Sequence, residues 1–121
     1  MDTLPCNAHT TASDALFMGV PVLTARGPTF AGRVAASLLS AIGMSELIAE
    51  SLPQYERRAL ELARNPQALA AVKAKLTANR ASAPLFDTAR FTRHLEAAFA
   101  GMCERHRRGL PPESFAVARA P

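Results

Sequence analysis

The 121-residue sequence predicts an α/β fold in which helices predominate, as one domain or a piece of one. Nearly half of the residues are apolar (49%), so the chain can form a hydrophobic core. Residues 7–24 read as a polar loop, a short helix, a glycine stop and a buried strand. Beyond them, apolar residues recur at helical spacing between glycines and prolines, which indicates several further helices.

The first predicted helix follows the polar loop and carries the side chains of most chemical interest. Thr10 or Thr11 can act as its N-cap, which leaves backbone N–H groups of the first turn without intrahelical partners. These donors, the two hydroxyls and the positive end of the helix dipole together predict a phosphate-binding site. Asp14, in the first turn or just after it, suits the dipole and could accept hydrogen bonds from a sugar diol. The segment therefore predicts a diphosphate-sugar site at the edge of an α/β sheet.

The remaining elements follow from glycine, proline and capping residues. Gly19 predicts a left-handed stop of the first helix, and Pro21 is compatible with the opening of a strand over Val20–Thr24. One strand cannot satisfy its own backbone groups, so we expect the sheet to be completed by sequence outside these residues. Residues 46–49 are too short to assign. Further helices are predicted over residues 30–42 (capped by Thr29), 53–64, 66–80 (capped by Asn65) and 88–108 (capped by Asp87).

The last predicted helix is closed by Gly109. We interpret its apolar stripe as core and its terminal arginines as complements of the helix dipole. The segment after it, residues 110–121, is rich in Pro and Ala and is predicted to be a flexible tail. The stripe consists of Phe91, Phe99 and Met102, and the arginines are Arg105, Arg107 and Arg108.

Composition narrows the function classes. The net charge is +4, but the cations alternate with glutamates as on a solvated face, so nucleic-acid binding is not expected. The sequence has no apolar run of about 18 residues, so no membrane partner is expected. The start of the sequence lacks the pattern of a secretion signal. Cys6 and Cys103 do not form a metal-ligand pair, and we interpret both as free thiols of a cytoplasmic protein.

Several blocks of the sequence, in order along the chain, resemble one enzyme family. They begin with Thr3–Thr11 (TLPCNAHTT), Asp14–Leu16 and Met18–Thr24 (MGVPVLT), and continue with residues 30–37, 46–49, 82–87, 90–91 and 95–99. In this series the chain is similar to the C-terminal catalytic lobe of the O-linked N-acetylglucosamine transferases, including bacterial tetratricopeptide-repeat forms and the SPINDLY type. The resemblance implies the nucleotide-sugar lobe of a two-lobed, Rossmann-like GT-B fold. Residues 1–109 would form the C-terminal part of that lobe.

The resemblance also implies roles for individual residues. His9, Thr10 and Thr11 would contact the diphosphate of a UDP-sugar, and Asp14 the ribose hydroxyls. The implied reaction transfers N-acetylglucosamine from UDP-GlcNAc to a Ser or Thr hydroxyl of an acceptor protein, without a metal or another cofactor. The acceptor lobe is not among these residues, so the chain would depend on it in cis or in trans and be inactive alone. No catalytic base is assigned.

Other interpretations stay open. Thr10 and Asp14 could be a plain helix cap with dipole compensation, and Arg33 with Thr29 could approach a donor phosphate or simply begin a helix. Ala8 stands where the family usually has Gly, so a left-handed backbone there would shift the loop. The main alternative function is a non-catalytic helical interaction module, or remnant of the lobe. In addition, Phe17 and Cys103 occupy positions where the family commonly has Trp, which predicts altered packing.

Overall fold

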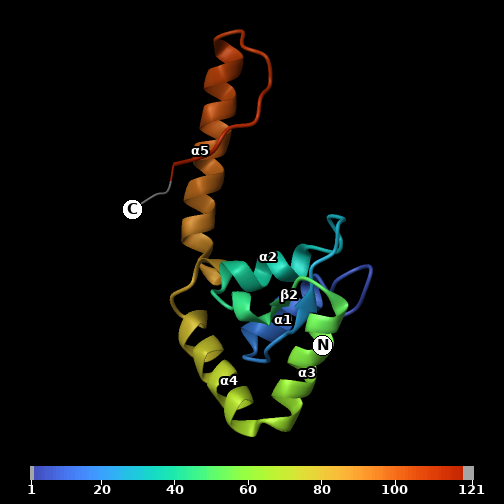
Figure 1. Ribbon diagram of the computed structural model, residues 1–121. Coiled ribbons are helices and arrows are strands. Elements are labelled where there is room, and N and C mark those ends of the chain that lie inside the picture. The colour runs from blue at the N-terminus through green and yellow to red at the C-terminus, as the bar shows by residue number, and fades with distance from the viewer. Residues whose placement is uncertain (1, 119–121) are drawn as a thin grey trace. The chain divides into compact units, whose positions relative to one another are not determined.

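The structure is a computed structural model that describes residues 2–118 (Figure 1). The chain divides into two compact units, with the boundary between Phe86 and Asp87. In the first unit the elements follow in the order α1 (Thr10–Phe17), β1 (Thr24–Ala25), α2 (Val34–Ala41), the 3-10 helix η1 (Ser45–Leu47), β2 (Ile48–Ala49), α3 (Leu52–Arg64), α4 (Pro66–Arg80) and η2 (Pro84–Phe86). The second unit is built on α5 (Thr88–Arg107).

A two-stranded parallel sheet lies at the centre of the first unit. Thr24 pairs with Ile48 and Ala25 with Ala49. The predicted strand over Val20–Thr24 is therefore shorter than expected and shifted by one residue at its end. We also expected the partner strand of β1 to come from outside these residues. This expectation is wrong for the edge of β1 that pairs with β2, because β2 belongs to the same chain. Gly43, at φ +72°, ends the preceding helix and returns the chain toward β1.

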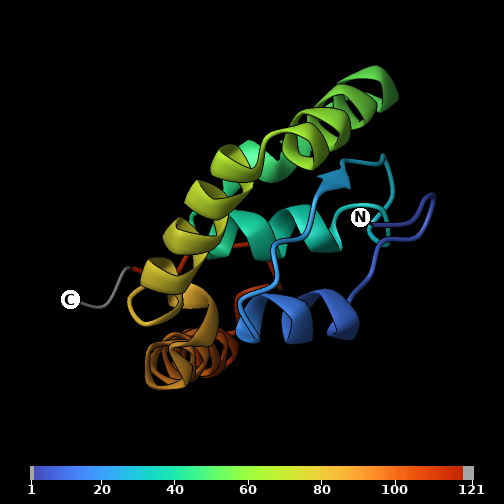
Figure 2. The same cartoon turned by 90° about the horizontal axis from the view of Figure 1, so that it is seen from below.

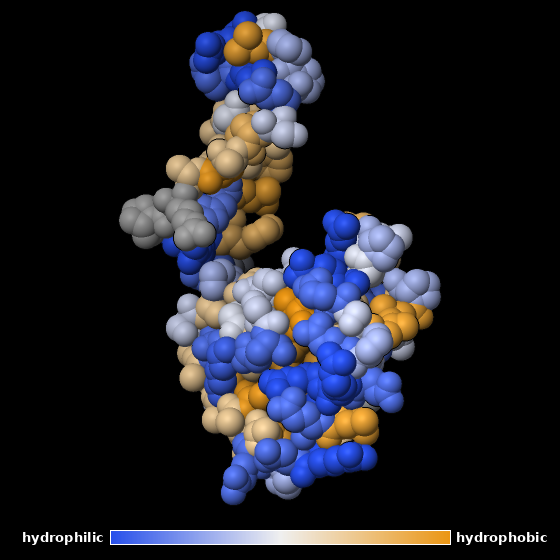
Figure 3. All heavy atoms as spheres, in the orientation of Figure 1, coloured by the Kyte–Doolittle hydropathy of each residue, from blue (hydrophilic) through white to orange (hydrophobic). Residues whose placement is uncertain are grey.

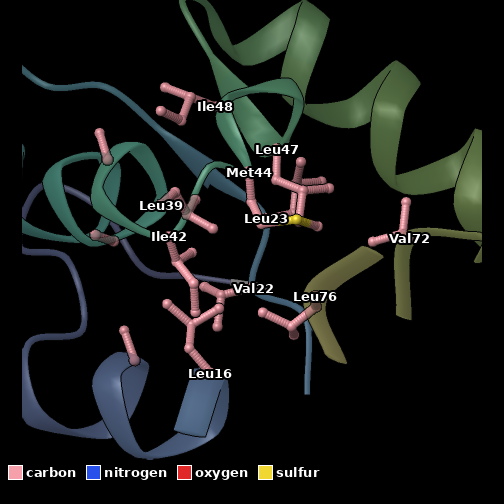
Figure 4. Close-up of a cluster of buried hydrophobic side chains, with 13 residues drawn as sticks. Leu16, Val22, Leu23, Leu39, Ile42, Met44, Leu47, Ile48, Val72 and Leu76 are labelled. Atoms are coloured by element: carbon pink, nitrogen blue, oxygen red, sulfur yellow. The ribbon is translucent and has the colours of Figure 1, made fainter. Parts of the chain in front are cut away.

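Four helices surround this sheet. α3 packs on both strands and on α4, and α2 packs on β1, while α1 contacts both α2 and α4 (Figures 1 and 2). The helices meet in one hydrophobic core, in which Leu16, Val22, Ile42 and Leu76 point toward one another (Figure 4). α1 contributes Ala12 and Leu16 to this core. The core thus fixes the inner face of α1 and leaves its other face to solvent.

Capping residues explain where the later helices begin. The side chain of Asn65 accepts a hydrogen bond from the N–H of Ala68 (3.0 Å), and Pro66 occupies the first helical position, which confirms the prediction for α4. Asp87 likewise caps α5. The prediction for α2 is wrong by four residues. Thr29 accepts a hydrogen bond from Gly32 N–H (3.1 Å), so it closes a turn of the loop and the helix begins only at Val34.

The second unit corrects the assignment of the apolar stripe on α5. Phe91, Phe99 and Met102 are each more than half exposed, and α5 has no buried residue, so the stripe is not part of a hydrophobic core. Figure 3 shows apolar side chains at the surface of this unit. The segment after α5 turns back along it: the Arg105 Nε donates to the Pro111 carbonyl (2.7 Å). Residues 119–121 of the predicted tail lie outside the described residues.

The ion pair between Glu46 and Lys75 joins η1 to α4 at 2.7 Å and makes stability depend on pH. Partial burial raises the pKa of Glu46, but the hydrogen bond from Lys75, a backbone hydrogen bond and the charges of Lys75 and Arg58 outweigh it and lower the pKa. The contribution to stability is therefore present above the ordinary pKa of 4.5 and lost as pH falls through the folded value. Because the pair is partly exposed, we expect it to contribute less than about 1 kcal/mol to the free energy of unfolding. Urea unfolding of wild type and Glu46→Gln should differ at pH 7 and converge near pH 3.

Candidate functional site

The four side chains singled out in the sequence lie together at the N-terminal end of α1. Thr10, Thr11 and Asp14 fall within about 100° of the helix circumference, because residues three and four apart share a face. All three are exposed, as is His9 directly before them. Ala12 and Leu16, on the opposite face, are buried. The packing of α1 therefore presents the polar set to solvent as one surface.

The cap of α1 differs from the predicted one. Thr10 is already helical, so the N-cap is His9 and not Thr10 or Thr11. The His9 side chain makes no capping hydrogen bond, and the first helical bond runs from Ser13 N–H to the His9 carbonyl (3.1 Å). The first turn also holds no acidic residue, and Asp14 lies one turn further on. The backbone N–H groups of the first turn therefore point outward without a side-chain cap, which suits an anion.

The loop after β1 lies against this helix start. The Asn7 N–H donates to the Ala31 carbonyl (2.9 Å), and the His9 ring nitrogen Nε2 lies 3.4 Å from the same oxygen. The Phe30 ring meets the His9 ring edge-on at 6.3 Å between centroids. α1 thus begins beside the carboxyl end of β1, which is the edge where open parallel sheets bind ligands. Phe30 is 84% exposed there, although the sequence placed it inside a helix.

Asn7, in the loop before α1, was not singled out from the sequence. Asn7 is only 4% exposed, and its Nδ2 donates to the Thr3 carbonyl (3.2 Å). Its Oδ1 is buried without a hydrogen-bond partner among the described residues. Ala8, the next residue, does not have a left-handed backbone, because no non-glycine residue in the described part of the chain has a positive φ. The alanine therefore fits this loop without the left-handed strain considered above.

The other two candidate donors, Arg33 and Thr29, make hydrogen bonds within the loop before α2. The Arg33 Nε donates to the Gly27 carbonyl at 3.2 Å, and the Thr29 hydroxyl accepts from Gly32. These contacts favour the structural interpretation of both residues.

Over residues 2–118, no group of three or more His, Cys, Asp or Glu side chains is placed to hold a metal ion. In the same range, no helix is long and apolar enough to cross a membrane. Cys6 and Cys103 are both unpaired and exposed, as predicted.

Comparison with known proteins shows which family this chain belongs to. Residues 1–95 match the model of glycosyl transferase family 41. The chain belongs to glycosyl transferase family 41. It is 42% identical over 118 residues to the probable UDP-N-acetylglucosamine–peptide N-acetylglucosaminyltransferase SEC of Arabidopsis thaliana, covering 97% of this chain and 12% of that protein. It is 36% identical over 111 residues to the corresponding Caenorhabditis elegans enzyme, covering 92% of this chain and 10% of the relative.

A solved structure of the same family agrees with the fold. The Thermobaculum terrenum O-GlcNAc transferase, as a mutant, is 40% identical and superimposes with a TM-score of 0.77 over 84% of this chain and 19% of its own. The family 41 chain is therefore a predominantly helical, C-terminal portion of the Rossmann-like nucleotide-sugar lobe of a GT-B fold. It spans only about a tenth of the length of the curated relatives it matches.

Proposed function

We propose that this chain forms the donor-binding part of an enzyme that transfers N-acetylglucosamine from UDP-GlcNAc to Ser or Thr hydroxyls of proteins. The observation that carries the proposal is the exposed N-terminus of α1, which has no side-chain cap and holds Thr10 and Thr11 beside the carboxyl end of β1. The names of the family 41 relatives supply the donor and the reaction class.

His9, Thr10 and Thr11 are assigned to the diphosphate. When the sugar leaves, negative charge develops on the departing diphosphate, and donors already aimed at it lower the barrier. The first-turn N–H groups, the two hydroxyls and the helix dipole provide such donors in a fixed arrangement. In the proposed site, protein groups supply this stabilisation without a metal or cofactor.

Asp14 is assigned to the ribose. It lies one helical turn after Thr10, on the same exposed face, so it would reach a group joined to the diphosphate at its nucleoside end. A carboxylate is an acceptor only, which suits two neighbouring hydroxyl donors. The groups that bind the acceptor protein belong to a further lobe, supplied in cis or in trans.

The two exposed thiols, which form no disulfide, support a cytoplasmic location for this chain.

Replacing Asp14 and Thr11 separately should distinguish the two assignments. Asp14→Ala should weaken UDP and leave inorganic diphosphate nearly unchanged, because only UDP carries the ribose. Thr11→Ala should weaken both by about 1.5–3 kcal/mol, the contribution of a hydrogen bond to a charged group. Both ligands are titrated against each variant by calorimetry or by NMR chemical shifts, since binding to this part of the enzyme is expected to be weak.

Thr77→Ala is the matched control, because Thr77 is an exposed threonine on α4 whose hydroxyl donates to the Lys73 carbonyl. It should bind both ligands as wild type does. Equal losses for UDP and diphosphate in Asp14→Ala would reject the ribose assignment. Wild-type affinity for diphosphate in Thr11→Ala would reject the placement of the diphosphate at α1.

A further inference from the structure

Asp2 joins three separate parts of the first unit through its carboxylate. Its Oδ1 accepts hydrogen bonds from the backbone N–H of Thr3 (2.8 Å) and of Ala8 (2.7 Å). Its Oδ2 accepts from the hydroxyl of Thr24 (2.7 Å), the fully buried first residue of β1. Ala8 is the residue directly before His9. One carboxylate therefore ties both ends of the loop over residues 3–8 to the sheet.

The backbone of Asp2 is held as firmly as its side chain. Its N–H donates to the Leu23 carbonyl (3.0 Å) and to the Tyr55 hydroxyl (2.9 Å). The Tyr55 hydroxyl in turn donates to the Asp2 carbonyl at 2.9 Å. Because Tyr55 belongs to α3, the position of Asp2 is set by both the strand and a helix.

We infer that Asp2 is a positioning residue for the donor site. It holds the loop over residues 3–8 so that His9 and the first turn of α1 face the ligand edge of the sheet. The inference rests on the function proposed above, since it concerns the same site. We assign Asp2 no contact with the ligand, because its carboxylate is an acceptor like the diphosphate and already accepts three hydrogen bonds, from Thr3, Ala8 and Thr24. A fixed donor geometry matters here because donors that must reorganise lose much of their effect on a developing charge.

The role is geometric and does not need the negative charge. In Asp2→Asn, the amide oxygen can accept from Thr3 and Ala8, and the amide NH2 can donate to the Thr24 hydroxyl oxygen. The Thr24 hydroxyl then has the Ala25 carbonyl as acceptor, 3.5 Å away in the present structure. Removing an anion beside a diphosphate site also reduces repulsion. Asp2→Asn should therefore bind diphosphate as well as wild type or better, whereas Asp2→Ala releases the loop.

The test measures the loop and the ligand separately on the whole chain. Amide hydrogen exchange of Ala8 is followed by NMR without ligand, with the amide of Leu39 in the core as an internal reference for global unfolding. Inorganic diphosphate is then titrated. In Asp2→Ala we expect Ala8 exchange to rise at least about tenfold and diphosphate affinity to fall about tenfold, the effect of losing one hydrogen bond to a charged group. Asp2→Asn should keep Ala8 exchange at the wild-type level and bind diphosphate at least as tightly as wild type.

A second variant keeps the test decisive if Asp2→Ala fails to fold. Thr24→Val removes the hydroxyl partner of Oδ2 at nearly constant shape and should move Ala8 exchange and diphosphate affinity in the same direction by a smaller factor. The inference is overturned if these variants exchange Ala8 as slowly as wild type, or if they exchange it faster and still bind diphosphate normally. A wild-type chain that binds neither diphosphate nor UDP overturns the proposed function, and the exchange data, taken without ligand, tell the two failures apart.

Discussion

Incubated alone with labelled UDP-GlcNAc and a Ser/Thr-rich peptide, the chain should transfer no sugar above background. The reaction requires donor and acceptor held in line, and only donor-binding groups are assigned to these residues. Catalytic groups that act as a unit give almost no rate when one half is missing. Adding the remaining lobe in trans should restore transfer, measured as label incorporated into the peptide.

The restored activity should depend on the N-terminus of α1. Thr10→Ala and Thr11→Ala should each lower transfer about a hundredfold, the effect of removing one preorganised donor to a developing negative charge. Thr77→Ala, on α4, should leave it unchanged. Transfer by these residues alone would show that the catalytic groups have been misplaced. Full activity of Thr10→Ala and Thr11→Ala in the restored enzyme would show that the diphosphate site has been misplaced at the N-terminus of α1.

Leu39→Ala should lower the free energy of unfolding by about 2–5 kcal/mol. Leu39 lies on α2, is 0% exposed and belongs to the core that also contains the inner face of α1. Truncating it therefore leaves a cavity that the packed surroundings can close only in part. Leu60→Ala is the matched control, because Leu60 also lies inside a helix, α3, but is 42% exposed. It should cost about 1 kcal/mol or less. Urea unfolding followed by circular dichroism measures both.

The same core variant tests how the site is supported. If α1 is oriented by the core, Leu39→Ala should also weaken diphosphate binding under conditions in which the chain remains folded. Equal losses of stability in the Leu39 and Leu60 variants would contradict the assignment of the core to α1, α2, α4 and the sheet.

The elements that were predicted correctly are those whose signals are local. Asn65 followed by Pro66 specifies the start of α4 because both the cap and the first helical position act within one turn. Gly19 and Gly109, which were predicted as helix stops, both adopt positive φ. The polar residues at the start of α1 were singled out from a local signal too, a polar loop directly before a short helix.

The elements that were predicted wrongly depend on partners far along the chain. β2 pairs with β1 across more than twenty residues, and nothing in residues 46–49 alone marks it as a strand. The stripe on α5 has helical spacing in either case, and whether it is covered depends on its neighbours and not on its own residues. The start of α2 is an exception with a local cause. The Gly32 N–H donates to the Thr29 hydroxyl within the loop, a competition with helix capping that residue spacing does not reveal.

By itself the sequence determined the family, the helix boundaries with clear caps and the polar residues at the start of α1. Only the tertiary structure decided that the loop after β1 lies against His9 and that Asp2 holds the loop before α1. The physical reason is range. Caps and periodic faces are fixed within one or two helical turns, whereas hydrogen bonds such as Asp2 to Thr24 and Tyr55 join residues 22 and 53 positions apart and exist only once the chain has folded.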